Sequence, residues 1–243
     1  GDVVFNSGSN FTVEANGSTP GSGHDQLNVT GTVLAGGGAG ANGLYLMDPT
    51  NVFLGQGQTT PIETALNSGT DVLIETSAAG GQPGFIDVVG VITKTSGGDA
   101  TLTFKAHDSI RLRNSITSTA GKLNLIFHSD SDSSGAGGFT MSSGELITNG
   151  GNLVIGGGVD PLVNPAIGSS AIAELFNGVL LFGSVIDTGE GNVSILGQGQ
   201  FSLATGGSNG ILFGGNPNPT RITTTTGSIT LFGQGGISSS STT

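Results

Sequence analysis

The chain has 243 residues, including 46 glycines and no cysteine, and 17 acidic residues against 6 lysines and arginines give it a formal net charge of −11. A chain this acidic, without a basic cluster, is expected to repel nucleic acid and anionic membrane surfaces. No apolar run approaches the roughly 20 residues that span a bilayer, so membrane insertion is not expected. The glycines lack the three-residue period of collagen, and short alternating runs of Ile, Leu, Val and Phe predict an all-β chain.

The first 60 residues hold the least regular strand-like segments and are expected to form irregular N-terminal coils. Alternating runs at 11–13, 27–29 and 44–46 are separated by loops rich in glycine, serine and proline. The strand-like run that starts at Val3 has no basic and apolar leader before it, so we expect a mature or excised piece of a longer protein. The run from Pro61 to Thr64 is expected to be an early copy of an Ile-Thr strand that recurs later.

Between residues 61 and 236 three kinds of short strand follow one another in a fixed order. The first kind starts at Val72, Leu102, Leu123, Leu153, Val193 and Ile229. The second contains Ile86 and Val88, Ile110 and Leu112, Phe139 and Met141, Val179 and Leu181, and Ile211 and Phe213. The third contains Ile92, Ile116, Ile147, Ile186 and Ile222, each followed by a glycine corner and the next strand of the first kind. Such self-similarity indicates units that stack on their neighbours.

The repeat predicts a right-handed parallel β-helix, a solenoid of about seven coils with three short strands per coil. Length varies mostly at one loop per coil, where an insertion hangs outside the stack. The longest insertion is an excursion at residues 156–177, in which residues 170–176 are compatible with a helical turn. Residues 237–243 are expected to be a Ser/Thr tail or linker.

Two expectations concern the core and the ends of the stack. Leu123, Leu153, Val193 and Ile229 are expected to lie in one inward stack on a parallel sheet. No amphipathic capping helix is expected at either end, so both terminal coils should display unpaired backbone groups. We therefore expect either a longer parent chain to supply the next coil covalently or the chain to associate with itself, head to tail, through its terminal coils.

Several runs resemble the filamentous-haemagglutinin-like exoproteins of Gram-negative bacteria, which use two-partner secretion. They are GDATLTFKAH at 98–107, SITSTAGKLN at 115–124, SDSD at 129–132 and NGGNLVIGGG at 149–158. The run DQLNVTG at 25–31 is similar to strand repeats of autotransporter passengers. The resemblance implies a right-handed parallel β-helix, export to the cell surface or extracellular space, and a role in adhesion or biofilm, with host or matrix glycans and proteins as partners.

The run from Ser129 to Ser134 places Asp130 and Asp132 in a polar loop whose oxygen atoms are a weak candidate for Ca²⁺. The loop lacks the spacing of an EF-hand, so a solvated loop is the favoured interpretation and no cofactor is expected. His107 and His128 both follow strands of the first kind and are expected to stack on neighbouring coils. Two histidines alone rarely hold a metal, which favours a structural interpretation for them too.

The only basic and acidic cluster that the pattern assembles contains Arg111, Arg113 and Lys105, with Asp87 on the strand before. A surface ion-pair face is the favoured interpretation, and no catalytic residue is assigned. We therefore expect a structural or adhesive segment of an exported bacterial surface protein, or a self-stacking filament subunit, rather than an enzyme. The alternative is a carbohydrate-active β-helix enzyme, a polysaccharide lyase or hydrolase, which requires converging acids and bases.

Overall fold

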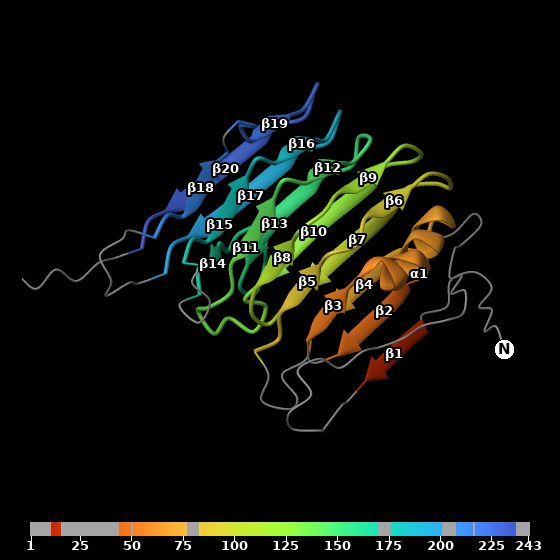
Figure 1. Ribbon diagram of the computed structural model, residues 1–243, viewed down its shortest axis with the longest axis horizontal. Helices are drawn as coiled ribbons and strands as arrows, with labels where there is room; N and C mark the ends of the chain where they lie inside the picture. Colours follow the sequence, from red (N-terminus) through yellow and green to blue (C-terminus); the bar gives the residue numbers. More distant parts are fainter. Residues whose placement is uncertain are drawn as a thin grey trace, which may run out of the picture.

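A computed structural model describes residues 11–15, 44–49, 51–76, 83–169, 176–200, 208–215 and 217–236. These residues form three parallel sheets of stacked strands and one helix, so the predicted all-β solenoid, a parallel β-helix, is confirmed (Figure 1). The predictions for residues 3–5, 170–175 and 237–243 lie outside the described residues.

Each kind of strand forms its own sheet, in the order in which the coils follow one another. Sheet A contains β1 (Phe11–Ala15), β2 (Leu44–Pro49), β4 (Asp71–Glu75), β7 (Ala100–Lys105), β10 (Leu123–Ser129), β13 (Leu153–Gly157) and β17 (Val193–Gln198), with β14 (Ala166–Ile167) and β20 (Ile229–Gln234) both paired to β17. Sheet B contains β3 (Val52–Leu54), β5 (Ile86–Val88), β8 (Ile110–Leu112), β11 (Phe139–Ser142), β15 (Val179–Phe182) and β18 (Ile211–Gly214). Sheet C contains β6 (Ile92–Lys94), β9 (Ile116–Ser118), β12 (Glu145–Ile147), β16 (Val185–Asp187) and β19 (Arg221–Thr223).

The four residues predicted to form one inward stack all lie on sheet A, as expected. The pairing of β10 with β13, however, is shifted by two residues from the prediction. Leu125, and not Leu123, pairs with Leu153, and the pairing then continues along β17 and β20 as predicted. Leu123 is buried opposite Ala100, because β10 begins two residues before the start of β13. A shift of two residues leaves the facing of every side chain unchanged, so the alternating pattern could not reveal it.

A shift of one residue occurs on β12, where Leu146 occupies the inward position that was predicted for Ile147. Leu146 pairs with Ile116 and Ile186 and is fully buried, whereas Ile147 pairs with Thr117 on the outward face. The seven-residue step that separates Ile116 from Leu123 also separates Leu146 from Leu153, while Ile147 gives a step of six. The spacing from the strand before the glycine corner to the strand after it therefore indicated the correct register of β12.

A helix, α1 (Gln56–Asn67), replaces the strand that was predicted at residues 61–64. Its buried side chains, Thr59, Ile62, Ala65 and Leu66, recur at helical spacing, so one face of the helix packs on the core. The helix contacts β6, β4 and β3 and lies over the N-terminal part of the stack (Figure 1). It occupies the place of the next strand in sheet C, while β1 continues sheet A past this coil.

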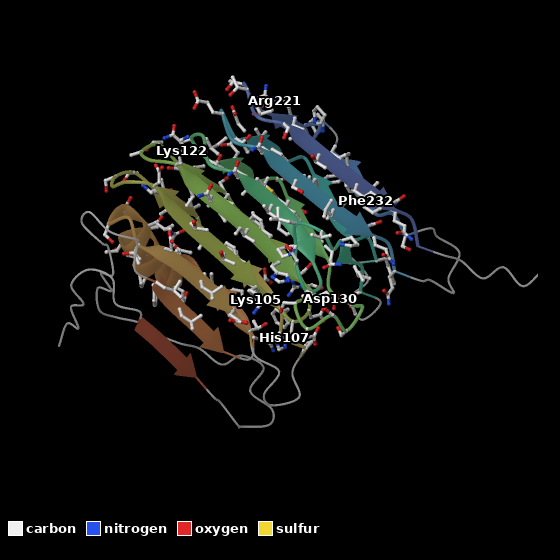
Figure 2. All side chains as sticks on the ribbon, turned by 180° about the vertical axis from the view of Figure 1, so that it is seen from behind. Lys105, His107, Lys122, Asp130, Arg221 and Phe232 are labelled. Carbon is white, nitrogen blue, oxygen red and sulfur yellow. The ribbon has the colours of Figure 1, made fainter. Side chains whose placement is uncertain are left out.

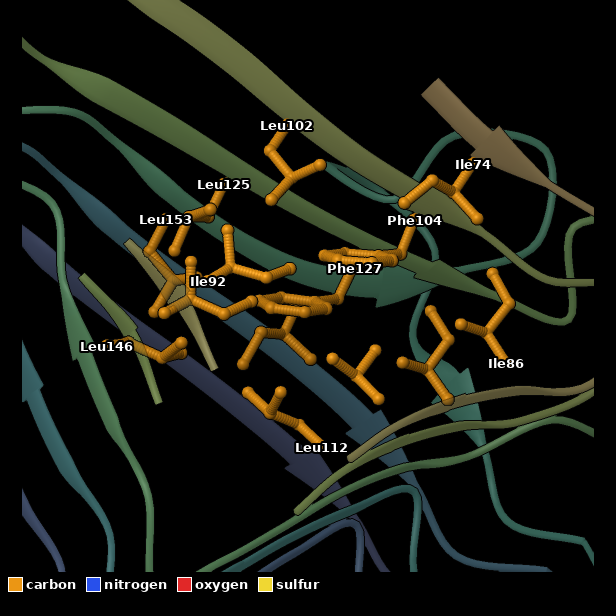
Figure 3. Close-up of a cluster of buried hydrophobic side chains, with 14 of the residues drawn as sticks. Ile74, Ile86, Ile92, Leu102, Phe104, Leu112, Leu125, Phe127, Leu146 and Leu153 are labelled. Carbon is orange, nitrogen blue, oxygen red and sulfur yellow. The ribbon is translucent and has the colours of Figure 1, made fainter. Parts of the chain in front are cut away.

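The core is a set of apolar columns that the three sheets direct inward (Figure 3). Phe104 and Phe127 of neighbouring coils stack with their ring centroids 5.3 Å apart and their planes 4° apart. The ring centroid of Phe127 also lies 4.7 Å from that of Phe139 in sheet B, so aromatic rings pack between the two sheets across the core. Burial of each such side chain contributes about 1.5–3 kcal/mol, and stacking makes that burial continuous from coil to coil.

A second column, made of hydroxyl side chains, lies at the glycine corners between sheets C and A. The hydroxyls of Ser118, Thr148 and Thr188 each donate to the carbonyl oxygen of the glycine three residues later, at 2.6–3.0 Å. A Cβ atom on Gly191 or Gly227 would collide with the backbone of the corner in the coil before. Glycine is needed there because backbone packs directly on backbone.

Candidate functional site

The Asp130–Asp132 loop is ordered by its own hydrogen bonds. Oδ1 of Asp130 accepts from the Ser134 hydroxyl at 3.0 Å and from the backbone N–H groups of Gly135 and Ala136 at 3.0 and 3.3 Å. Asp132 Oδ1 accepts from the backbone N–H of Ser134 at 3.1 Å. Asp130 is also buried and has a positive φ of 49°. These oxygen atoms act as turn-forming acceptors in a loop whose residues Asp132, Ser133 and Ser134 are exposed to solvent.

Asp108 lies beside this loop, and its backbone carbonyl oxygen accepts a hydrogen bond from the backbone N–H of Asp130 at 3.0 Å. Burial raises the pKa of the Asp108 carboxyl, the Ser109 hydroxyl opposes the rise, and the charges of Asp130 and Asp132 add to it. Within the described ranges, no group of three or more histidine, aspartate and glutamate side chains is arranged to hold a metal ion. The Ca²⁺ hypothesis for Asp130 and Asp132 gains no support from this geometry.

The two predicted histidines do not share a rung of sheet A. The register places His128 opposite Lys105, and His107 follows two residues later, with its backbone N–H on the Thr76 hydroxyl. Lys105, His107 and Asp130 lie toward the same edge of the stack (Figure 2). His128 is buried, and its Nε2 lies 2.5 Å from the Gly158 carbonyl oxygen, which makes it the donor of that hydrogen bond. Burial lowers the pKa of His128, so its neutral form is favoured.

The basic cluster forms the predicted ion pairs on the outer face of sheet B. Asp87 pairs with Arg111 at 3.1 Å and with Arg113 at 2.9 Å, and the Arg111 guanidinium lies 5.1 Å from the centre of the Phe85 ring. Lys105 pairs instead with Glu75 on sheet A. Because Asp87 serves both arginines, the cluster is an ion-pair network that carries one excess positive charge.

A ladder of hydrogen-bonded asparagines crosses the outer face of sheet A. This ladder was not predicted from the sequence. Asn124 Oδ1 accepts from the backbone N–H of Asn152 at 3.0 Å, and Asn152 Oδ1 accepts from that of Asn192 at 2.9 Å. Asn192 Oδ1 continues the ladder to the backbone N–H of Ser228 at 2.8 Å. The signal was present in the sequence, because Asn152, Asn192 and Ser228 each follow a corner glycine directly.

Beside this ladder lies a groove of about 390 Å³, which the first part of the predicted excursion borders. Its lining combines amide, hydroxyl and aliphatic groups, and no charged side chain contributes: Thr101, Asn124, Ile126, Asn152, Leu153, Val154, Leu162, Asn192 and Ser194. The excursion does not hang wholly outside the stack as was expected, since β14 returns to pair with β17. Leu162 comes from the loop between β13 and β14 and is 60% exposed.

The first strand of sheet B and the last coil of the stack differ in how far their inward residues are covered. On β3, Val52 and Leu54 are 2% and 1% exposed. In the last coil, Phe213 of β18 and Leu231 of β20 occupy equivalent inward columns but are 44% and 46% exposed. Ile229, the last member of the predicted stack, is exposed for the same reason. The C-terminal coil therefore presents the apolar surface that inner coils bury.

The acidic charge of the chain is concentrated away from this coil. All 17 acidic residues lie at or before Glu190, and Arg221 is the only Asp, Glu, Lys or Arg residue after it. Arg221 of β19 and Phe232 of β20 both belong to the last coil (Figure 2). The last coil therefore adds no acidic charge of its own to a contact, although Asp187 of the coil before it pairs with Thr223.

No protein-family model matches the sequence, and no curated protein matches it. In the part of the chain that the structure describes, no helix is long and apolar enough to cross a membrane.

Proposed function

We propose that this chain is a structural and adhesive β-helix segment of an exported bacterial surface protein, acting outside the cell, and that it associates through its C-terminal coil. The observation that carries this proposal is the exposure of the inward residues Phe213, Ile229 and Leu231 on that coil. Exposed apolar residues beside unpaired strand edges recruit a further strand or coil. The resemblance to filamentous-haemagglutinin-like exoproteins supports the exported location and the adhesive role.

The partner proposed for this coil of the 243-residue chain is a second copy of the same chain, and a further coil of a longer chain would cover the same surface. A copy carries the same nearly uncharged coil, so the contact brings together two surfaces that lack the acidic charge of the remainder. Among the described residues, exposed inward apolar side chains lie on the C-terminal coil, whereas Val52 and Leu54 of β3 are covered. The contact is therefore an isologous one, in which the C-terminal coils of two copies meet and close a dimer.

The test is sedimentation velocity of the whole chain over a range of concentrations. We expect a concentration-dependent dimer for the wild type and a monomer for Leu231→Asp, because a carboxylate in the contact loses its hydration without gaining a partner. Val159→Asp is the matched control, since Val159 is an exposed valine outside this coil, and it should dimerise as the wild type does. A wild type that stays monomeric, or equal behaviour of the two variants, would contradict the proposal.

The carbohydrate-active alternative and the binding of host or matrix glycans or proteins remain hypotheses, and no arrangement of the described residues favours either of them.

A further inference from the structure

We propose that the groove between the asparagine ladder and the loop at residues 158–164 binds an extended, uncharged peptide segment with aliphatic side chains. The site lies on the outer face of sheet A and is independent of the C-terminal coil. Its volume of about 390 Å³ falls at the lower end of the roughly 300–1,000 Å³ that ligand sites occupy. It therefore accommodates a short stretch of chain rather than a folded domain.

The loop that borders the groove is held in one shape by hydrogen bonds. Asp160 Oδ1 accepts from the backbone N–H of Leu162 at 2.9 Å, and the Asp160 carbonyl accepts from that of Asn164 at 2.8 Å. The Asn164 carbonyl accepts from the backbone N–H of Gly157 at 2.9 Å, and His128 fixes the carbonyl of Gly158. Leu162 is thus displayed before any ligand arrives, which reduces the entropic cost of binding.

The same loop exposes more apolar surface than its own fold requires. Val159, Leu162 and Val163 are 83%, 60% and 71% exposed. Of these three side chains only Leu162 lines the groove, together with Ile126 and Val154, so Leu162 is the one that indicates a surface packing against apolar groups of a ligand.

The polar groups of the groove show which ligand atoms it can satisfy. The ladder uses Oδ1 of Asn124 and Asn152, while among the described residues Nδ2 of these two side chains makes no hydrogen bond. The hydroxyls of Thr101 and Ser194 also line the groove without a hydrogen-bond partner in that part of the chain. Two amide donors and two hydroxyls suit the carbonyl and N–H groups of a peptide backbone.

The charge and shape of the lining exclude other ligand classes. A charged ligand would lose hydration in a groove that offers no countercharge, and an anion would also meet the field of a chain with net charge −11. A neutral sugar packs its apolar faces best on aromatic rings, and none of the lining residues is aromatic. Aliphatic side chains on an uncharged peptide match Ile126, Val154 and Leu162.

The test uses the whole chain, labelled with ¹⁵N, and an acetylated and amidated hexapeptide of sequence Ser-Val-Ser-Leu-Ser-Val. We expect saturable shifts of the side-chain amide signals of Asn124 and Asn152 in NMR titrations. Hexapeptides with aspartate or lysine in place of the aliphatic residues, and the neutral sugar cellohexaose, should leave these signals unchanged.

Two exposed positions of the loop provide a matched pair of variants. Leu162→Ala should weaken hexapeptide binding about tenfold, because it removes apolar contact area from the groove. Val163→Ala, one residue away and outside the lining, should change the affinity less than about twofold. Both side chains are largely exposed, so neither variant should lower the melting temperature appreciably.

Three results would overturn the inference. They are unchanged Asn124 and Asn152 signals at millimolar hexapeptide, a response to cellohexaose or a charged peptide instead, and equal effects of Leu162→Ala and Val163→Ala. A fourth such result is a loss of dimerisation in Leu162→Ala, because it would assign the groove to a second copy.

Discussion

Phe104 and Phe127 lie on neighbouring strands of sheet A with their rings stacked 5.3 Å apart, although 23 positions separate them in the sequence. Each ring is fully buried, and Phe127 also reaches Phe139 of sheet B. These ring contacts pack one coil on the next and join sheets A and B across the core.

Phe127→Ala is expected to lower the free energy of unfolding by about 3–5 kcal/mol, because it removes a buried ring and leaves a cavity that the stacked coils cannot fill. Chemical denaturation followed by circular dichroism measures the change. Val159→Ala, at an exposed position, serves as the control and should stay within about 0.5 kcal/mol of the wild type. Similar losses in the two variants would show that the stacked rings do not hold the core.

Lys94 is fully buried in the hydroxyl column at the glycine corners, where later coils carry Ser118, Thr148 and Thr188. Its ammonium donates to the carbonyl oxygens of Ser96 and Ala120, each at 2.6 Å. Burial lowers the pKa of this ammonium, and the charge of Asp99 partly opposes the change. The carbonyls thus replace only part of the lost hydration.

Lys94→Ala is expected to destabilise the fold by about 1–3 kcal/mol, because it leaves these carbonyl oxygens without a donor. Lys94→Thr restores the residue type of the later coils, so it should recover part of the loss. Urea unfolding of both variants at neutral pH measures the difference. Equal stability of the alanine and threonine variants would rule out a role for the hydrogen bonds at this corner.

His128 should make the fold sensitive to mild acid. Its pKa in the folded chain is lowered from 6.5 by burial, so the unfolded chain takes up the proton more readily. Its contribution to stability is therefore present above pH 6.5 and is lost as the pH falls from 6.5 through the lower pKa of the folded state. The nearby charges of Lys105, Asp160 and Glu75 modulate the shift but do not reverse it.

Thermal unfolding between pH 7.5 and pH 5, with about 0.5 pH steps, tests this expectation. The melting temperature of the wild type should fall across the interval, and that of His128→Gln should fall less, because glutamine does not titrate. His107→Gln is a suitable control at a histidine outside this contact. Parallel pH profiles of the wild type and His128→Gln would contradict the assignment.

Two roles can be distinguished for Asp130: a structural hydrogen-bond acceptor or a metal ligand. Asp130→Ala should lower the free energy of unfolding by about 1–3 kcal/mol, because the Ser134, Gly135 and Ala136 donors lose a buried acceptor. Addition of EDTA should leave the melting temperature of the wild type unchanged. A large decrease with EDTA that Asp130→Asn abolishes would instead support a Ca²⁺ site at Asp130 and Asp132.

The kinds of strand and their order were predictable from the sequence because alternation and glycine spacing are local properties. Leu153 and Ile155 alternate with outward residues, and Gly151 marks the corner before them, so each coil specifies its own strands. The Asp87–Arg111 pair was also predictable, because opposite charges stand on consecutive strands of the same kind. These features depend on neighbours in the chain or on the neighbouring repeat.

The tertiary structure alone decided the register of β10, the helix and the groove. Leu123 and Leu125 are both apolar and face the same way, so only strand pairing places Leu125 beside Leu153. Ile62 suits a strand as well as a helix, and burial of the whole face of α1 resolves that ambiguity. The groove requires Leu162 to lie beside Ile126, which is 36 positions earlier, and His128 to hold the loop at Gly158. Contacts over such distances follow from how the coils stack, which a local pattern of residues does not contain.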